Sequence, residues 1–271
     1  MSAPLEVAGA WKLPRWRMTN LARKELWALL VNPVSWIIFL LFYLFRAIEL
    51  MNIVAHHAFR GDADIFVSNY FQTASTQFAV IMIPPILTMR SFAEEKRSGS
   101  LELLLTAPYH DHEVVLGKWL AAWVFYGLLW LPTLLLLYVL QSPYFLNTSF
   151  HYGYVFSSYV GVFSFGSLLL AAGLFTSSLT DNQVLASLSS MLFGLGLLVL
   201  PNVLSQSLAP SRQGVDAGFL SVLLDQAYVL QHLWKWFFRG LIDSGHMVFY
   251  LSTTALFLFL TVRVVEARKW R

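Results

Sequence analysis

Two adjacent glutamates, Glu94 and Glu95, are the residues best suited by type to acid–base chemistry. Glutamates that act together with histidines can activate water for hydrolysis. Here Lys96 and Arg97 follow the pair directly, and no histidine lies inside an apolar run of the sequence. An intramembrane hydrolase is therefore the weaker alternative for this chain, and we expect no catalytic residue in it.

The histidines include two short groups, His56-His57 and His110-x-His112, the second beside Asp111 and Glu113. Histidines one or two positions apart point in different directions on a helix, so neither spacing demands a shared metal ion. The chain has no cysteine, which excludes a thiolate metal site and a disulfide framework. We therefore predict no metal and no cofactor in this chain.

The dipeptide Gly117-Lys118 does not complete a phosphate-binding loop. His112 stands where that loop has its first glycine, and Trp119 stands where it has Ser or Thr. The chain is therefore not expected to be an enzyme, and any ATP and Mg²⁺ would be bound by a partner. Its net charge of +3 gives no bulk attraction to nucleic acid.

The elements that position these residues follow from an apolar composition. Of the 271 residues, 57% are hydrophobic and 12% are charged, against roughly 25% charged in soluble domains. Six apolar runs are long enough for a helix to cross about 30 Å of hydrocarbon. They cover residues 34–54, 70–90, 114–140, 152–178, 184–204 and 246–265. The sequence thus predicts an all-α polytopic membrane protein with six transmembrane helices, forming a single domain over residues 1–271.

The basic residues predict the orientation of these spans, because Lys and Arg stay on the cytoplasmic side. Three groups would lie on that side: Lys12, Arg15, Arg17, Arg23 and Lys24; Arg90, Lys96, Arg97 and Lys118; Arg263, Arg268, Lys269 and Arg271. Both termini are then cytoplasmic. Six spans agree with this, because an even number of spans places both termini on the same side. Arg46 falls inside the first span, three residues from Glu49, and the two are expected to pair or to extend toward the membrane surface.

Residues 11–31 have the pattern of an amphipathic helix that lies in the membrane surface. Trp16 suits the interface, and Arg23 and Lys24 lie on the polar side. Glu25 interrupts the apolar side, so either it has a specific partner or it lies at a solvated helix edge.

The second span carries a polar stripe followed by two prolines. The stripe consists of Asn69, Gln72, Thr73, Thr76 and Gln77, at three- and four-residue spacing. Polar groups that face lipid are costly, so the stripe is expected to line a pathway or to pack against another helix. Pro84-Pro85 is expected to kink or break the helix. In the fifth span, Ser190 and Gly194 belong to a small-residue face that permits close helix packing.

Residues 205–245 are long and largely apolar, which favours a re-entrant or surface-lying helical element outside the cytoplasm. On the other side, residues 98–108 are expected to form a short helix between two helical stalks. Gly99 ends the first stalk, and Leu101, Leu104 and Leu105 would give the short helix an apolar face. No soluble domain of the chain could cover these leucines, so they are expected to bind a partner or to lie flat on the membrane.

At these residues the chain resembles the permease subunits of the type 2 ATP-binding-cassette exporter family, particularly its gliding-motility-type branch. The resemblance rests mainly on the long string from Thr88 to Thr106, with Ala22-Arg-Lys-Glu25, Val115-Leu-Gly-Lys118 and Phe238-Arg-Gly-Leu-Ile-Asp243 as further anchors. It implies that 98–108 is a coupling helix seated in a groove of a separate ATPase subunit. The coupling residues would be Glu94, Glu95, Arg97, Gly99, Leu101, Glu102, Leu104 and Leu105.

The resemblance further implies a permease that works as a dimer, with a second copy or a paralogue, in the bacterial inner membrane. The pathway would be lined by the second and fifth spans, including Pro84, Ser190 and Gly194. An auxiliary extracytoplasmic protein and membrane lipid are possible further partners. A secondary transporter driven by an ion gradient is the remaining alternative, although no acidic residue lies at the centre of a span. The transported substrate is not identified by the sequence.

Overall fold

The computed structural model describes residues 17–57, 63–100, 110–141, 151–208 and 229–268, and these residues form helices and no strands. The helices are α1 (Arg17–Val31), α2 (Pro33–His57), α3 (Ala63–Gln72), α4 (Ala74–Thr88), α5 (Ala93–Ser98), α7 (Asp111–Leu140), α8 (Tyr152–Leu179), α9 (Gln183–Leu208), α11 (Val229–Lys235), the 3₁₀ turn η2 (Phe237–Arg239) and α12 (Ser244–Arg268). The predicted all-α class is thus confirmed for the described residues.

Four of these helices are long and apolar enough to cross a membrane. Their apolar segments are Pro33–Ala55, Asp111–Val139, Tyr152–Leu179 and Ser244–Ala267, which correspond to the first, third, fourth and sixth predicted spans. The fifth predicted span falls in α9, of which Gln183–Leu197 is a shorter apolar helix. The second falls in α3 and α4. The count of six spans therefore stays a prediction.

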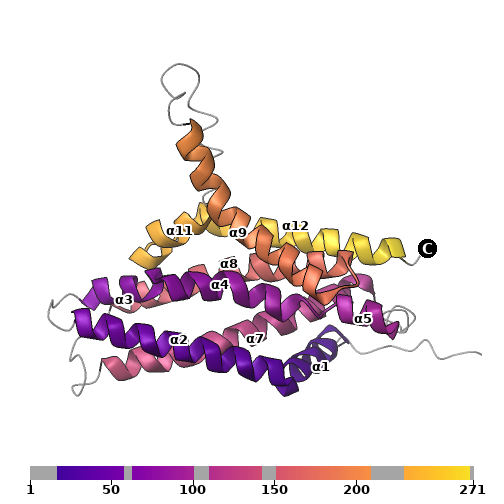
Figure 1. The fold of residues 1–271 in the computed structure, drawn as a ribbon, viewed down its shortest axis with the longest axis horizontal. Helices are drawn as coiled ribbons and strands as arrows, with labels where there is room; N and C mark the ends of the chain where they lie inside the picture. Colours follow the sequence, from indigo (N-terminus) through magenta and orange to yellow (C-terminus); the bar gives the residue numbers. More distant parts are fainter. Residues whose placement is uncertain (1–16, 58–62, 101–109, 142–150, 209–228, 269–271) are drawn as a thin grey trace, which may run out of the picture.

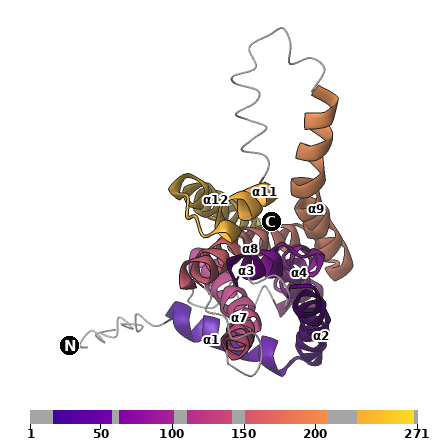
Figure 2. The same ribbon diagram turned by 90° about the vertical axis from the view of Figure 1, so that its left-hand side faces the viewer.

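Helix α8 lies at the centre of the bundle, surrounded by α3, α4, α7 and α12 (Figure 2). Its sequence is apolar or small on every side, which suits a helix that is buried all round. Glycines permit the close packing: a Cβ on Gly166 would overlap the ring of Tyr126, and one on Gly173 would overlap the hydroxyl of Thr88. The C-terminal part of α9 extends away from the rest of the bundle (Figure 1).

The second predicted span is not one continuous helix. It divides at Thr73, where the backbone is extended (φ −68°, ψ 154°), into α3 and α4. The paired prolines, which were expected to kink or break the helix, lie inside α4, so the helix does not break there, and a kink at that place stays a prediction. The break occurs instead among the polar residues, whose hydroxyl groups replace backbone hydrogen bonds: Thr73 and Thr76 both donate to the carbonyl of Tyr70, at 3.1 and 3.2 Å.

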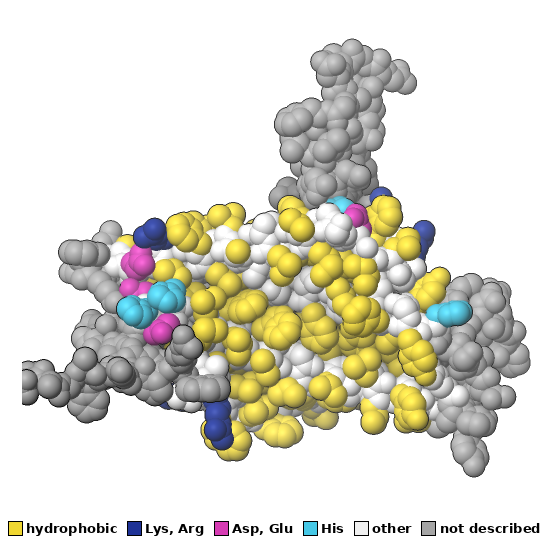
Figure 3. All heavy atoms as spheres, turned by 180° about the vertical axis from the view of Figure 1, so that it is seen from behind, with side chains coloured by type: hydrophobic (Ala, Val, Ile, Leu, Met, Phe, Trp, Pro, Cys, Tyr) yellow, Lys and Arg dark blue, Asp and Glu magenta, His cyan; other side chains and the backbone are white. Residues whose placement is uncertain are grey.

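Helices α1 and α5 and the C-terminal end of α12 lie at the same end of the bundle (Figure 1). We call this the basic end, because it carries Arg23, Lys24, Lys96, Arg97 and Lys118. Hydrophobic side chains cover the middle of the face seen in Figure 3, and most of the charged ones on that face lie toward its ends. That distribution fits a helix bundle whose middle faces hydrocarbon.

Beyond α9, the described part of the predicted 205–245 element is α11 with η2. Leu233, Phe237 and Phe238 of this part are buried against the core. Gly240, with φ of 81°, then ends η2 and turns the chain toward α12. Residues 209–228, which complete the predicted element, lie outside the described residues.

Candidate coupling site at the basic end

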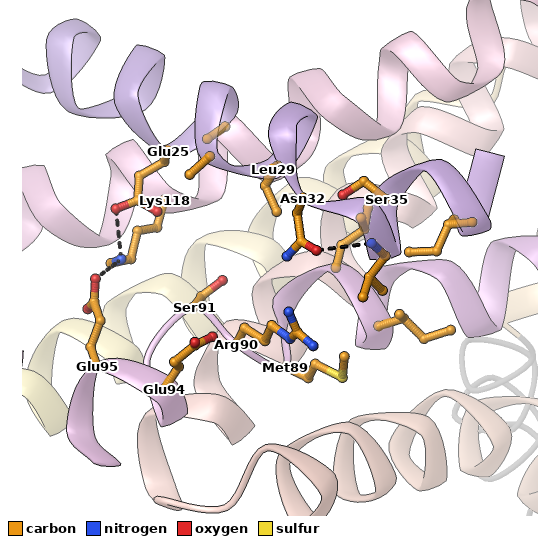
Figure 4. A pocket seen from close by; sticks show the side chains of 16 residues that line it. Glu25, Leu29, Asn32, Ser35, Met89, Arg90, Ser91, Glu94, Glu95 and Lys118 are labelled. Atoms are coloured by element: carbon orange, nitrogen blue, oxygen red, sulfur yellow. Dashed lines mark hydrogen bonds and ion pairs between the residues drawn. The ribbon is translucent and has the colours of Figure 1, made fainter. Parts of the chain in front are cut away.

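Lys118 binds two carboxylates from two other segments of the chain (Figure 4). Its Nζ donates to Glu25 Oε1 at 3.0 Å and to Glu95 Oε1 at 2.6 Å. Its side chain is only 2% exposed, so both bonds are sheltered from water. The three residues come from α1, α5 and α7, and each belongs to one of the motifs that carry the family resemblance. We call this group the Lys118 triad.

Packing between α1 and α7 places Glu25 over Lys118. Leu21 is buried against Val114 and Val115 of α7, and a Cβ on Gly117 would come within 3.1 Å of Leu21 Cδ2. Residues four apart lie on the same helix face, so Glu25 follows Leu21 as Lys118 follows Val114. Glu25 therefore has a specific partner, the first of the two possibilities left open by the sequence. The apolar side of α1 is directed, at Leu21 and Ala22, toward α7.

Helix α5 is also tied to the end of α8. Ser177 Oγ accepts hydrogen bonds from the backbone N–H groups of Phe92 and Ala93, both at 3.1 Å, and donates to the carbonyl of Met89 at 3.2 Å. Lys96 donates to the carbonyl of Ser178 and lies 3.8 Å from a carboxylate oxygen of Asp181. The short helix is thus held on one side by α8 and on the other by the Lys118 triad.

The electrostatic balance of the triad is set by burial. Burial raises the pKa of Glu95 above its ordinary value, Lys118 opposes that rise, and Glu25 adds to it. Two carboxylates share a single ammonium group, and Glu95 Oε2 is buried with no hydrogen-bond partner among the described residues. The triad therefore holds α5 in place, but the single ammonium group does not fully compensate the negative charge of both carboxylates.

The predicted coupling residues differ in where they lie. Glu95 points inward to Lys118, whereas Glu94 and Arg97 are exposed. Gly99 has φ of 71° and ends α5, as the sequence predicted. Leu101, Glu102, Leu104 and Leu105 lie outside the described residues, as does Trp16 of the predicted interfacial helix, while Arg23 and Lys24 are exposed on α1.

The polar stripe of α3 and α4 meets a residue that the sequence reasoning had not connected with it, Arg46 of α2. The guanidinium lies 3.7 Å from the ring centroid of Tyr70 and donates to that residue's hydroxyl and carbonyl oxygens, at 3.2 and 3.3 Å. It also donates to the hydroxyls of Thr73 and Thr76 and lies 3.6 Å from Glu49, the pairing expected from the sequence. Thr73 and Thr76 therefore pack against α2, and their assignment to a pathway stays a prediction.

The other predicted pathway residues have mixed surroundings. Gln72 donates to Ser68 Oγ at 2.6 Å, Gln77 donates to the carbonyl of Gln72 at 3.3 Å, and both, like Asn69, are partly exposed. Three others are enclosed or closely packed within the chain: Pro84 and Ser190 are buried, and a Cβ on Gly194 would lie 3.2 Å from Ile81.

The histidines predicted not to bind metal are placed as follows. The rings of His110 and His112 stack with their centroids 5.3 Å apart, and the backbone N–H of His110 donates to Glu113 Oε2 at 3.0 Å. Helix α7 begins with His110 as its N-cap. The described residues contain no group of three His, Asp or Glu side chains that could hold a metal ion.

One comparison with known proteins identifies a family. The family model described as ABC-2 family transporter protein matches residues 66–211, more than half of the chain. The matched segment includes α4, α5 and α8, and it contains both Glu95 and Lys118. No curated protein matches the chain. By this match, the protein belongs to the ABC-2 family of transporter proteins.

Proposed function

We propose that the chain is the transmembrane subunit of an ABC-type exporter of the gliding-motility-type branch. In this proposal it pairs with a second copy or a paralogue to form the substrate pathway, and a separate subunit binds ATP and Mg²⁺. The family match supports the membrane role. The absence of a phosphate-binding loop from the sequence supports the need for a separate ATPase.

The observation that carries the coupling role is the double attachment of α5. This helix ends at Ser98, the first residue of the segment 98–108 that is proposed to contact the ATPase. On one side Glu95 binds Lys118 of α7, and on the other Phe92 and Ala93 bind Ser177 of α8. A displacement of the coupling segment would therefore act on α5 and, through these contacts, on α7 and α8 together. Packed helices transmit such shifts because their interfaces deform little.

We further propose that the basic end faces the cytoplasm of a bacterial inner membrane and that both termini lie there. The distribution of Lys and Arg supports this orientation. It places α1, α5 and the end of α12 on the side where ATP is available. An auxiliary extracytoplasmic protein would then meet the opposite end, near α11 and η2.

The experiment is affinity purification of the tagged chain from its native membrane, followed by identification of any co-purified subunit that has a nucleotide-binding loop. Glu102→Lys and Leu104→Asp, both within 98–108, are expected to lose that subunit. Arg239→Asp, an exposed change in η2, is the matched control and is expected to retain it. Unchanged association in both coupling-segment variants would overturn the docking assignment. Addition of ATP should also drive transport by the purified complex, whereas a secondary transporter would need an ion gradient.

A further inference from the structure

A polar pocket at the basic end continues into an apolar groove between α2 and α4. The pocket is about 200 Å³ and includes Asn32, Arg90 and Glu94 in its lining. The groove is about 490 Å³ and is lined almost wholly by apolar side chains of the two helices. Ile38 and Ile86 line both spaces, so the pocket and the groove adjoin. Together they form one site with a polar end and an apolar length.

The groove opens sideways to the surroundings of the bundle. Leu41, Phe45 and Phe78, which line it, are each about half exposed: 47%, 50% and 58%. Because α2 is long and apolar enough to cross a membrane and α4 packs beside it, these side chains would face the bilayer. A hydrocarbon chain that enters from the lipid would fit such a groove.

Two charges in the pocket have no ion-pair partner among the described residues, Arg90 and Glu94. Figure 4 shows the Arg90 guanidinium directed into the pocket, on the side of Asn32 and Met89. Its Nε is buried and makes no hydrogen bond within the described part of the chain. Glu94, one helical turn later, also lines the pocket, while Lys118 is already occupied by Glu25 and Glu95. The pocket thus offers one guanidinium and one carboxylate to a ligand.

The surrounding charge decides between classes of ligand. A guanidinium pairs best with a phosphate or carboxylate, and this one lies where the apolar helices end, at the depth of lipid head groups. Glu25 and Glu95 share one ammonium group, so the Lys118 triad next to the pocket itself carries an excess of negative charge. A purely anionic head group would be repelled by that excess and by Glu94. A head group with both a phosphate and an ammonium group satisfies both free charges.

We propose that this site binds a phospholipid whose head group carries a phosphate and a primary ammonium group. The phosphate pairs with Arg90, the ammonium donates to Glu94, and one acyl chain lies in the groove between α2 and α4. This assignment rests on the proposed function in one respect only: the proposed orientation places the site in the cytoplasmic leaflet of the membrane. In an exporter, this is the class of molecule that the site would admit from that leaflet.

The test uses the detergent-purified full chain without an ATPase, titrated with dioleoyl phosphatidylethanolamine, phosphatidylglycerol or phosphatidylcholine and examined by native mass spectrometry. The ethanolamine lipid is expected to be retained at about tenfold lower concentration than the other two, the difference made by one charged hydrogen-bonded pair. Arg90→Gln should reduce its retention about tenfold. Glu94→Gln should abolish the preference for the ethanolamine lipid over phosphatidylglycerol. Arg97→Gln, an exposed change of the same charge on the neighbouring helix α5, should change neither.

The acyl-chain part of the site has its own pair of variants. Ile86→Trp narrows the junction of pocket and groove and should reduce retention of the ethanolamine lipid, whereas Leu128→Trp on α7, at nearly the same exposure (36% and 37%), should not. Stronger retention of phosphatidylglycerol by the wild-type chain, or equal losses in Arg90→Gln and Arg97→Gln, would overturn the proposal. If Arg90→Gln does not fold, Glu94→Gln at its exposed position decides alone. Since no ATPase is present, these results are independent of the docking experiment.

Discussion

Arg46 donates from Nη1 to the carbonyl oxygen of Tyr70, 3.3 Å away, at the point where α3 ends and α4 begins. A helix that ends in buried surroundings leaves carbonyl groups without partners, which is costly away from water. The Arg46 side chain of α2, which is 1% exposed, supplies one of the missing donors. Its positive charge also interacts favourably with the negative, C-terminal end of the α3 dipole. The break between α3 and α4 and the buried arginine therefore depend on each other.

We expect Arg46→Met to destabilise the protein by about 3 kcal/mol, because it leaves Glu49 and the Tyr70 carbonyl without their cation. Arg46→Lys should recover only part of the loss, since an ammonium group cannot reproduce the forked contacts with Tyr70 and Thr76. The free energy of unfolding in detergent measures both. Arg263→Met is the control: its pair with Glu266 is exposed and worth less than about 1 kcal/mol. Equal losses in Arg46→Met and Arg263→Met would contradict the bridging role.

A second prediction concerns the crossing of α4 and α8. Gly173→Ala should lower the free energy of unfolding by about 1–3 kcal/mol, because the added Cβ overlaps the Thr88 hydroxyl. Gly153→Ala on the same helix has open space around the new methyl group and should be neutral or stabilising by up to about 1 kcal/mol. The double variant Gly173→Ala with Thr88→Ala should recover part of the loss. No recovery would place the cause outside this contact.

The sequence was sufficient for the helices that are long and uniformly apolar. For the predicted spans 114–140 and 152–178, α7 and α8 differ at their ends by three residues at most, because run length against membrane thickness determines such helices. It was insufficient at Thr73. There a backbone break is stabilised by Arg46, which is 27 positions away in the chain, and no local pattern records that contact.

The candidate site shows the same division between local and tertiary information. The sequence indicated that Glu25 interrupts an apolar face, and it singled out Glu95 and Lys118 within separate motifs. It could not pair them, because their meeting depends on α1 packing over Gly117 of α7. Ser177, which fixes the start of α5, was missed because a serine near a helix end carries no distinguishing signal by itself.

A third prediction follows from the raised pKa of Glu95. When the pKa in the folded state exceeds that in the unfolded state, the group's contribution to stability is complete below the unfolded value, about 4.5, and is lost as the pH rises through the folded value. Glu95→Gln mimics the protonated side chain, so it should be more stable than the wild type at pH 8, and this difference should shrink toward pH 5. Thermal unfolding at the two pH values measures the effect. A stability difference that is the same at both pH values would contradict the raised pKa of the buried Glu95.

Single cysteines, which the native chain lacks, can show which positions of the polar stripe are accessible to water. Thr76→Cys should be protected from a polar thiol reagent in membranes, because Thr76 is 1% exposed and packs against Arg46. Gln77→Cys, one residue later and partly exposed, should react if that side of α4 lines a water-filled pathway. Protection at both positions would favour helix packing for the whole stripe. Reaction at Gln77→Cys that rises or falls with ATP in the presence of the ATPase subunit would assign that face to the moving pathway, because packing alone gives no dependence on the nucleotide.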